Sequence, residues 1–570
     1  MRAATSLLAR LRAARNAFGA AAERDKRALL RALATAALAT PAQVSALHED
    51  LLFLCAFPGS RATRALARRM LAGIGARVRR LPRVQRAALD DSGIAESTTR
   101  HVFPYPVAHW VARAAPADAE IDWRNVDDPA VLDALVRPLL TDSEREAFDS
   151  GEFATRDWMR RARRADAHSD LEWLMASTVA SAAGTQRFAD AWDDAEIPVA
   201  WQLRESRASV THNALAGVQA VPRSAMRRPP ADAIADIARP LPAIERLPRA
   251  RAQRVATAAR AALAARCREV NAMTYPNLDE VWWCDLGEGA ALAVIGIAPA
   301  HRLTLETNTG YLLFANGVPI GYGGVTPLYR QANTGINVFD PFRGSEAAYL
   351  WTQMLRAFRT LYGSGRFVVN AYQFGAGNAE AIASGAFWFY YRVGFRPAHA
   401  QARRLAAREA QRMAADRTYR SDARTLKALA VGDLHLDLPG FSEDDHFDEA
   451  LLPRVGALAA RTLAREPVWS RARAARRIAE RLAADLAIDE FARWSPRERR
   501  GFEFLAPAAA ALPGLRDWAA DDRAALAAML RAKGAPQERG FALKAQRAPR
   551  FFRAMRDALR AFPATGGRLR

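Results

Sequence analysis

The sequence predicts an α+β protein in which a central mixed sheet with flanking helices lies between two large, mainly α-helical regions. Residues 1–220 and 401–570 are rich in Ala, Leu and Arg, and their apolar residues recur three to four positions apart, as in helices. Residues 251–400 instead mix β-rich runs with helical spacing. Between these patterns, residues 221–250 contain six prolines, which prevent a continuous helix and are typical of a boundary.

Four segments follow from this patterning. We expect a mainly helical domain at residues 1–220, a proline-rich linker at 221–250, a mixed domain at 251–400, and a helical C-terminal region with a basic tail at 401–570. A chain of 570 residues is long enough for several hydrophobic cores.

Composition excludes several classes of protein. No apolar run reaches the roughly 18 to 20 residues that a membrane span needs, so we expect a soluble protein without a membrane partner. Three distant cysteines, Cys55, Cys267 and Cys284, cannot build a disulfide framework or a thiolate zinc site, which favours the cytoplasm. No histidines form an i, i+4 metal pair, and the acidic run from Glu443 to Glu449 lacks a calcium-loop spacing, so it predicts a solvated loop and no metal.

The net charge of +21 is mostly arginine, because only four of the 82 basic residues are lysine. So lopsided a ratio indicates a compositional bias, and we therefore discount the charge as a sign of nucleic-acid binding. The first 24 residues are arginine-rich and amphipathic, as in a transit peptide, although an exposed helix is the favoured interpretation. Residues 543–570 interleave eight basic residues with three phenylalanines, which fits either nucleic-acid binding or, as we favour, a docked amphipathic helix.

The most informative stretch runs from residue 335 to residue 397. A β-rich run at Gly335–Phe339 is interrupted by Pro341 and Gly344, and a helical pattern then runs from Ser345 to the helix-stopping Gly363. The first turn of such a helix leaves backbone N–H groups unpaired and pointing at one spot. That spot suits an anion such as pyrophosphate.

Two motifs in this stretch resemble those of the GNAT superfamily of N-acetyltransferases. Residues 343–348, RGSEAA, match the first and last positions of the family's Gln/Arg-x-x-Gly-x-Gly/Ala loop, with Glu346 in place of a glycine. The run from Tyr391 to Phe395 is similar to the family's Tyr-x-x-Gly-Phe, and Asn378 with Ala381 looks like the Asn-x-x-Ala that precedes it. The resemblance covers about a quarter of the chain.

Neighbouring segments agree with this resemblance. Asn316-Gly317 between two apolar runs predicts a hairpin, which the family has just before its cofactor strand. Residues 264–277 are expected to supply the family's first helix, and Asp433–Leu438 alternates like a late strand.

The resemblance implies a GNAT-like acyltransferase domain at 251–400 that moves an acetyl or other acyl group from acyl-CoA to the amine of a small molecule or a protein. By the same resemblance, the cofactor would be bound by Val338 and Phe339 along the pantetheine, by the pyrophosphate loop and by Asn378. The loop residues implied are Arg343, Gly344, Ser345, Ala347 and Ala348.

Catalysis would need an acid and a base. The resemblance implies that Tyr391 protonates the departing thiolate. A base is also needed, because an ammonium must lose a proton before it attacks a thioester. Glu306 and Asp340 are the candidates.

Three alternatives remain. A carboxylate at Glu346 would repel a pyrophosphate unless it points away, which suggests a different acyl carrier such as a charged tRNA. A catalytically inactive GNAT-shaped core could serve as an interaction module. A helical protein could bind RNA or tRNA through residues 544–570.

Overall fold

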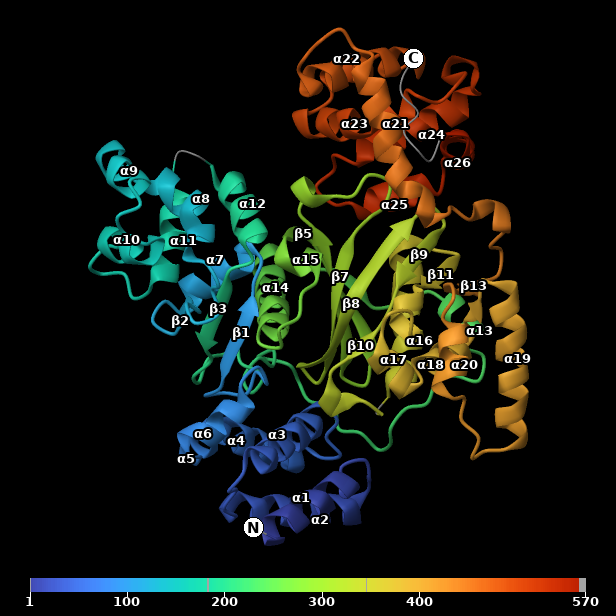
Figure 1. Cartoon of the computed structure of the whole chain (residues 1–570). Coiled ribbons are helices and arrows are strands. Elements are labelled where there is room, and N and C mark those ends of the chain that lie inside the picture. The colour runs from blue at the N-terminus through green and yellow to red at the C-terminus, as the bar shows by residue number, and fades with distance from the viewer. Residues whose placement is uncertain (1, 182–183, 345, 563–570) are drawn as a thin grey trace.

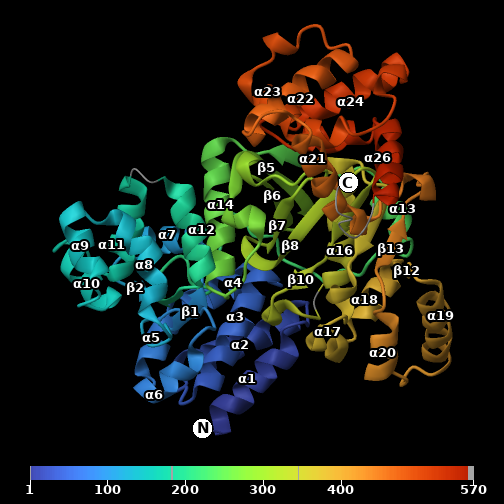
Figure 2. The ribbon, with the colours of Figure 1, turned by 45° about the horizontal axis from the view of Figure 1, so that its top comes forward.

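The computed structural model describes residues 2–181, 184–344 and 346–562, and it has a large mixed sheet with helices on both faces. Figures 1 and 2 place an N-terminal helical bundle and a set of C-terminal helices at opposite ends of that sheet. A smaller lobe lies beside the sheet, next to the N-terminal bundle. Within the described residues, no helix combines the length and apolarity that crossing a membrane requires.

The N-terminal bundle packs around α3, whose apolar residues Val44, Leu47 and Leu51 are fully buried. Leu8 and Leu11 of α1 are buried within it, and Ser60 caps α4 by accepting a hydrogen bond from Thr63 N. Its helices are α1 (Arg2–Ala14), α2 (Ala20–Thr35), α3 (Pro41–Ala56), α4 (Arg61–Ala72), α5 (Ile74–Arg80) and α6 (Arg83–Arg86).

The smaller lobe contains a three-stranded antiparallel sheet in a region for which the sequence predicts helices. Its order is β1-β3-β2, with β1 (Thr98–Val102), β2 (Ala119–Ile121) and β3 (Pro198–Gln202). These strands are short, and β3 pairs with strands about 80 to 100 residues earlier in the chain. No pattern within a short stretch of sequence therefore predicts them. The lobe's helices are α7 (Tyr105–Ala114), α8 (Asp133–Val136), α9 (Asp142–Asp149), α10 (Thr155–Ala162), α11 (Asp170–Ala180) and α12 (Thr185–Ala195).

The proline-rich segment lies against the central sheet. Its short helix α13 (Ala233–Ala238) packs on α16, and β4 (Ile244–Arg246) pairs with β5 and becomes one edge of the sheet. The segment therefore contributes to the fold of the central region.

The central sheet has the strand order β12-β13-β11-β9-β8-β7-β6-β5-β4, with β10 paired to β8. Among the strands of the described residues, β9 and β11 are the parallel neighbours in this sheet, and the other pairs are antiparallel. The Asn316-Gly317 hairpin forms between β7 and β8, with both residues at positive φ, 49° and 80°. The strands are β5 (Pro276–Gly287), β6 (Ala290–Ile297), β7 (Thr309–Ala315), β8 (Val318–Leu328), β9 (Gln331–Thr334), β10 (Asn337–Val338), β11 (Arg366–Val369), β12 (Arg396–Pro397) and β13 (Leu434–Asp437).

Helices cover both faces of this sheet. On β7, a Cβ added to Gly310 would touch Val270 and the helix α15 (Asn271–Thr274), whereas the ring of Tyr311 lies 5.5 Å from that of Phe358 on α16 (Ala347–Tyr362). Adjacent strand residues point to opposite faces, so α15 and α16 lie on opposite sides. The helix expected at 264–277 is reduced to α15, because the longer α14 (Arg249–Ala264) precedes a break where Cys267 has a φ of 53°.

Beyond β11 the chain forms α17 (Ala379–Ser384), α18 (Ala386–Val393), α19 (Ala400–Ala415) and α20 (Ala423–Leu429). It then enters β13, which lies where Asp433–Leu438 predicts a strand.

The C-terminal helices have their own hydrophobic core, which joins the sheet through Leu328 and Tyr329. Tyr329 stacks on Phe552 with ring centroids 4.4 Å apart, and Phe551 is buried as well. The predicted amphipathic tail helix is thus docked by its phenylalanines. The helices are α21 (Leu452–Ala464), α22 (Arg471–Asp485), α23 (Pro496–Ala509), α24 (Ala520–Ala532), α25 (Arg539–Ala545) and α26 (Pro549–Ala561).

Candidate functional site

The candidate site begins where two neighbouring strands part. β9 and β11 pair as far as Asn333 and Val368. The chain beyond β9 then stays with β8, because β10 pairs with Gly321 and Tyr322 and the Phe339 N–H donates to Ile320 O at 3.0 Å. The backbone of residues 335–338 consequently leaves β11, and we call this place the strand fork. Val338 is half-buried and Phe339 is buried.

A buried tyrosine on α18 reaches the fork. The hydroxyl of Tyr390 accepts a long hydrogen bond, 3.5 Å, from the Ile336 N–H, and its ring lies against Trp351 of α16. Burial raises the pKa of Tyr390 to about 12, so the phenol keeps its proton at neutral pH. A protonated phenol at this point can donate a proton to a group bound in the fork.

A second phenol supports the fork from β7. The Tyr311 hydroxyl donates a hydrogen bond to Gly335 O, and full burial raises the pKa of Tyr311 well above its ordinary value. Gly323 makes room for it, since a Cβ there would collide with the Tyr311 hydroxyl. Glycine at this strand position therefore allows a close approach.

Tyr391 and Asn378, both predicted site residues, make local contacts on α18 and α17. Tyr391 is half-buried, stacked on Phe387 and covered by the Arg396 guanidinium at 4.1 Å from its ring centroid. Asn378 caps α17, because its side-chain oxygen accepts from Ala381 N at 3.0 Å. The Tyr-x-x-Gly-Phe spacing selects Tyr391, whereas the rotation of α18 directs the hydroxyl of Tyr390 to Ile336.

The turn that precedes α16 is open at Gly344. This glycine has a φ of 77°, and a Cβ added there would meet no atom within 4 Å. Arg343 is exposed and bound to two carboxylates, Asp340 at 2.8 Å and Glu380 at 2.7 Å. Ala347 and Ala348 form the half-buried first turn of α16. Ser345, also predicted to bind the cofactor, lies outside the described residues.

Glu346 points away from this turn and into the protein. Its side chain is fully buried, and it forms an ion pair of 2.9 Å with Arg223 of the proline-rich segment. The other carboxylate oxygen accepts from Arg227 N at 3.0 Å. The charge that would repel a pyrophosphate is thereby paired on the inner side of the turn.

Arg223 also has unused hydrogen-bonding capacity. Its side chain is 1% exposed, and its Nε and Nη1 atoms make no hydrogen bond among the described residues, although Nη1 lies 4.0 Å from the Glu288 carboxylate. Arg223 lies with Glu346 on the inner side of the turn, so its guanidinium does not face the open side at Gly344. On the open side, the exposed Arg343 and the backbone N–H groups of the first turn of α16 are donors suited to an anion.

The two base candidates lie at different places. Asp340 is exposed in the turn beside α3, whereas Glu306 precedes β7 next to the C-terminal helices, where its carbonyl accepts from Lys533 Nζ at 3.0 Å. Burial, with the nearby Glu449 charge, raises the pKa of Glu306 to about 7. Such a group can accept a proton near neutral pH.

Glu449 belongs to the same surroundings and was missed by the sequence analysis. It accepts a hydrogen bond of 2.9 Å from Asn333, the last β9 residue paired with β11, and burial raises the pKa of Glu449. Its position in the acidic run 443–449 predicts a solvated loop. Its neighbour His446 instead bonds Gln331 at 2.8 Å, which folds the loop onto β9.

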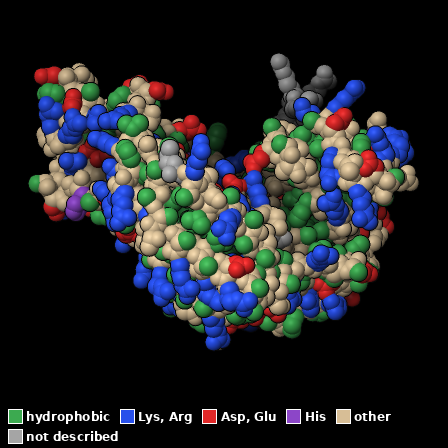
Figure 3. Space-filling model, turned by 90° about the horizontal axis from the view of Figure 1, so that it is seen from below, with side chains coloured by type: hydrophobic (Ala, Val, Ile, Leu, Met, Phe, Trp, Pro, Cys, Tyr) green, Lys and Arg blue, Asp and Glu red, His purple; other side chains and the backbone are tan. Residues whose placement is uncertain are grey.

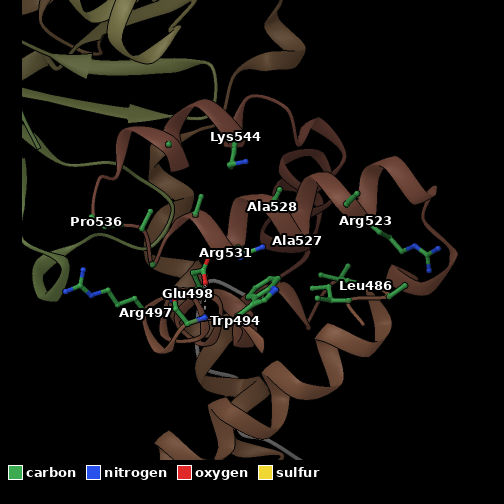
Figure 4. Close-up of a pocket in the computed structure, with 18 of the residues that line it drawn as sticks. Leu486, Trp494, Arg497, Glu498, Arg523, Ala527, Ala528, Arg531, Pro536 and Lys544 are labelled. Atoms are coloured by element: carbon green, nitrogen blue, oxygen red, sulfur yellow. Dashed lines mark hydrogen bonds and ion pairs between the residues drawn. The ribbon is translucent and has the colours of Figure 1, made fainter. Parts of the chain in front are cut away.

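A hollow of about 950 Å³ lies apart from the fork, among the C-terminal helices (Figure 4). Alanines of α24 and Trp494 form part of its wall, and Figure 4 shows Arg531 near Trp494 and Glu498. Arg531 pairs with Glu498 at 2.7 Å and lies over the Trp494 ring at 4.6 Å. Arg497 and Lys544, also on the wall, extend in different directions in this view. The cations around the hollow therefore do not converge on one point.

No cluster of three or more His, Cys, Asp or Glu side chains able to hold a metal ion occurs within residues 2–181, 184–344 and 346–562. Comparison with family models, with curated proteins and with solved structures finds no match to this chain.

Proposed function

We propose that the protein is an acyl-CoA-dependent N-acyltransferase with its active site at the strand fork. The observation that carries the proposal is the combination of a parallel strand pair that parts at Asn333 with a protonated phenol, Tyr390, directed at the parted backbone. The motif resemblance in residues 335–397 points to the same chemistry. Bound acyl-CoA would supply a thioester that an amine can attack.

Residues of the turn would hold the phosphates. The open N-terminus of α16 at Gly344, Ala347 and Ala348 would offer backbone N–H groups to them. Arg343 would exchange its exposed contacts with Asp340 and Glu380 for a phosphate, which costs little because exposed pairs contribute about 0–1 kcal/mol.

Proton transfer would be divided between two groups. Tyr390 would give its proton to the departing sulfur, since its raised pKa keeps it protonated. Glu306 would take a proton from the acceptor ammonium, helped by a pKa near neutrality. We assign the acid role to Tyr390 in preference to the sequence candidate Tyr391, because the Tyr390 hydroxyl reaches Ile336.

The test compares two adjacent tyrosines. Calorimetric titration of the full chain with acetyl-CoA should give measurable heat. With a panel of amines and a colorimetric assay for released thiol, Tyr390→Phe should lower kcat roughly a hundredfold. Tyr391→Phe, the matched control one position away, should leave kcat within about twofold.

Three outcomes would contradict the proposal in different ways. Absence of heat with acetyl-CoA would remove the cofactor and favour another acyl carrier. Binding without turnover across the amine panel, with both variants unchanged, would favour a catalytically inactive interaction protein. Loss of activity in Tyr391→Phe alone would return the acid role to the residue that the sequence predicts.

A further inference from the structure

The basic charge of this chain is concentrated in the N-terminal bundle. Residues 1–86 contain 17 basic and four acidic residues, whereas residues 87–250 contain 19 basic and 26 acidic ones. The bundle thus has a net charge of +13 out of +21, and the segment that follows has a net charge of −7. A compositional bias would raise arginine in both segments alike, so it does not account for this division.

The helices α4 to α6 are the extreme case. Residues 61–86 contain nine arginines and no acidic residue. Three of these arginines have structural partners: Arg64 donates to Asn316 O, Arg77 donates to carbonyls at the end of α2, and Arg79 pairs with Glu96 and Glu205. Arg86 is only half-exposed.

The five others are exposed and have no ion pair or side-chain hydrogen bond in the part of the chain that the structure describes. We call them the arginine face, and they are Arg61, Arg68, Arg69, Arg80 and Arg83. On α4, Arg61 and Arg68 lie along one stripe about 10 Å apart, and Arg69 lies about 100° further round the helix. Arg80 is the last residue of α5 and Arg83 is the first residue of α6. Figure 3, which views this end of the molecule, shows many blue side chains over it and few red ones.

The acids of the bundle do not neutralise this face. Glu23 is buried and accepts from Lys26, Ser60 and Thr63. Asp50 is buried and paired with Arg12 and Arg15, and Glu49 is also paired with Arg12. Three of the four carboxylates therefore serve internal contacts, and the field of the arginine face extends into solvent.

The chemistry of the face selects among polyanions. Guanidinium groups bind phosphates bidentately. A membrane surface would favour several large apolar side chains exposed between the cations. Ala67 and Leu71 of α4 are buried and Leu66 and Met70 are half-buried, so Val84, beside Arg83, is the one large apolar side chain exposed within residues 61–86. A single valine offers little area for insertion into a membrane. No aromatic side chain lies within residues 61–86, so base stacking is not offered. The face fits a phosphate backbone, contacted without regard to sequence.

We propose that the arginine face of the N-terminal bundle binds the phosphate backbone of a nucleic acid. This surface differs from the C-terminal tail, whose Phe551 and Phe552 are buried. It also stands independently of the acyltransferase proposal, since none of its residues lies at the strand fork.

The experiment measures fluorescence anisotropy of a labelled 20-nucleotide single-stranded RNA with the full-length protein at several salt concentrations. The test variant is Arg68→Gln/Arg69→Gln/Arg83→Gln. The control is Arg471→Gln/Arg473→Gln/Arg476→Gln on α22, which removes the same charge from exposed positions elsewhere. Circular dichroism and thermal unfolding should show both variants folded.

We expect the test variant to weaken RNA binding about tenfold to a hundredfold near 0.1 M salt. It should also reduce the slope of log K against log salt by roughly two, because three phosphate contacts are lost. The control should change the affinity less than about threefold. Equal weakening of RNA binding in both variants would show that binding depends on net charge alone, and it would overturn the proposal. Displacement of the RNA by polyglutamate at equal charge concentration would assign the face to an acidic protein instead. Displacement by phosphatidylserine vesicles at equal charge concentration would assign it to a membrane surface.

Discussion

Removing the charge of Glu346 should destabilise the protein, although the loop motif that residues 343–348 resemble has a glycine at this position. Both members of the Glu346–Arg223 pair are almost fully buried. Burial raises the pKa of Glu346 more than Arg223 lowers it, and burial lowers the pKa of Arg223, so the pair has a high desolvation cost. Glu346→Gln keeps the shape of the side chain but leaves Arg223 as a buried cation whose remaining carboxylate partner is the exposed Glu288, 4.0 Å away. That situation costs about 3–5 kcal/mol.

The partner variants make the magnitude testable. Arg223→Met alone leaves a buried carboxylate and should cost a similar amount. The double variant Arg223→Met/Glu346→Gln removes both charges, so it should be more stable than either single variant, and the coupling between the two sites should be about 2–3 kcal/mol. The glutamine oxygen can still accept the hydrogen bond from the Arg227 N–H, so the substitution removes the charge without removing this hydrogen bond.

Urea unfolding followed by tryptophan fluorescence is the appropriate assay, because the buried Trp351 lies on α16 five residues after Glu346. Midpoints should fall for both single variants and recover in part for the double variant. A Glu346→Gln midpoint equal to that of the wild type would refute the buried-pair argument. A gain in acetyl-CoA affinity on the same substitution would show that the carboxylate faces the phosphates in solution.

Three further predictions concern other contacts. Burial raises the pKa of Glu280 to about 7, so the folded state retains a proton that the unfolded state releases near pH 4.5. The free energy of unfolding should therefore fall as the pH rises from about 4.5 to about 7. Burial lowers the pKa of His48 to about 3, which makes the free energy of unfolding change with pH in the opposite sense. The contribution of Glu280 is therefore the difference between the pH slopes of wild type and Glu280→Gln, and equal slopes would contradict the assignment. Gly534→Ala would press a methyl group onto Arg497 O and should cost roughly 2–3 kcal/mol, measured by thermal unfolding; an unchanged midpoint would deny the close approach of the two backbones. Gly323→Ala would displace the Tyr311 hydroxyl and should lower turnover with little change in acetyl-CoA affinity, whereas normal turnover would show that Tyr311 does not support the fork.

Local sequence patterns predict those elements whose structure depends on a few adjacent residues. The Asn316-Gly317 turn, the end of α16 at Gly363 and the strand β13 all lie where sequence spacing predicts them. Each depends on a property of a few adjacent residues, such as glycine at positive φ or period-two alternation. The strands of the smaller lobe were missed because their pairing joins segments far apart in the chain.

The candidate site could be predicted only in outline, for the same reason. Glu346 is 123 residues from Arg223, so no spacing reveals that the carboxylate turns inward. The choice between Tyr390 and Tyr391 depends on how α18 is rotated, and adjacent helical residues differ by about 100°. Burial of Phe387 and Trp388 sets that rotation, and burial is a property of the whole fold.

The flanking regions hold α16 at both of its ends. At its N-terminus, Glu346 is bound by Arg223 of the proline-rich segment. At its C-terminus, Arg539 of α25 donates to Leu361 O at 2.7 Å, where a cation also complements the helix dipole. Glu280 in turn accepts from the Glu538 and Arg539 N–H groups, which ties α25 to β5. The direction in which the open N-terminus of α16 points is therefore set by segments outside the 335–397 stretch, and these segments are part of the architecture of the fork.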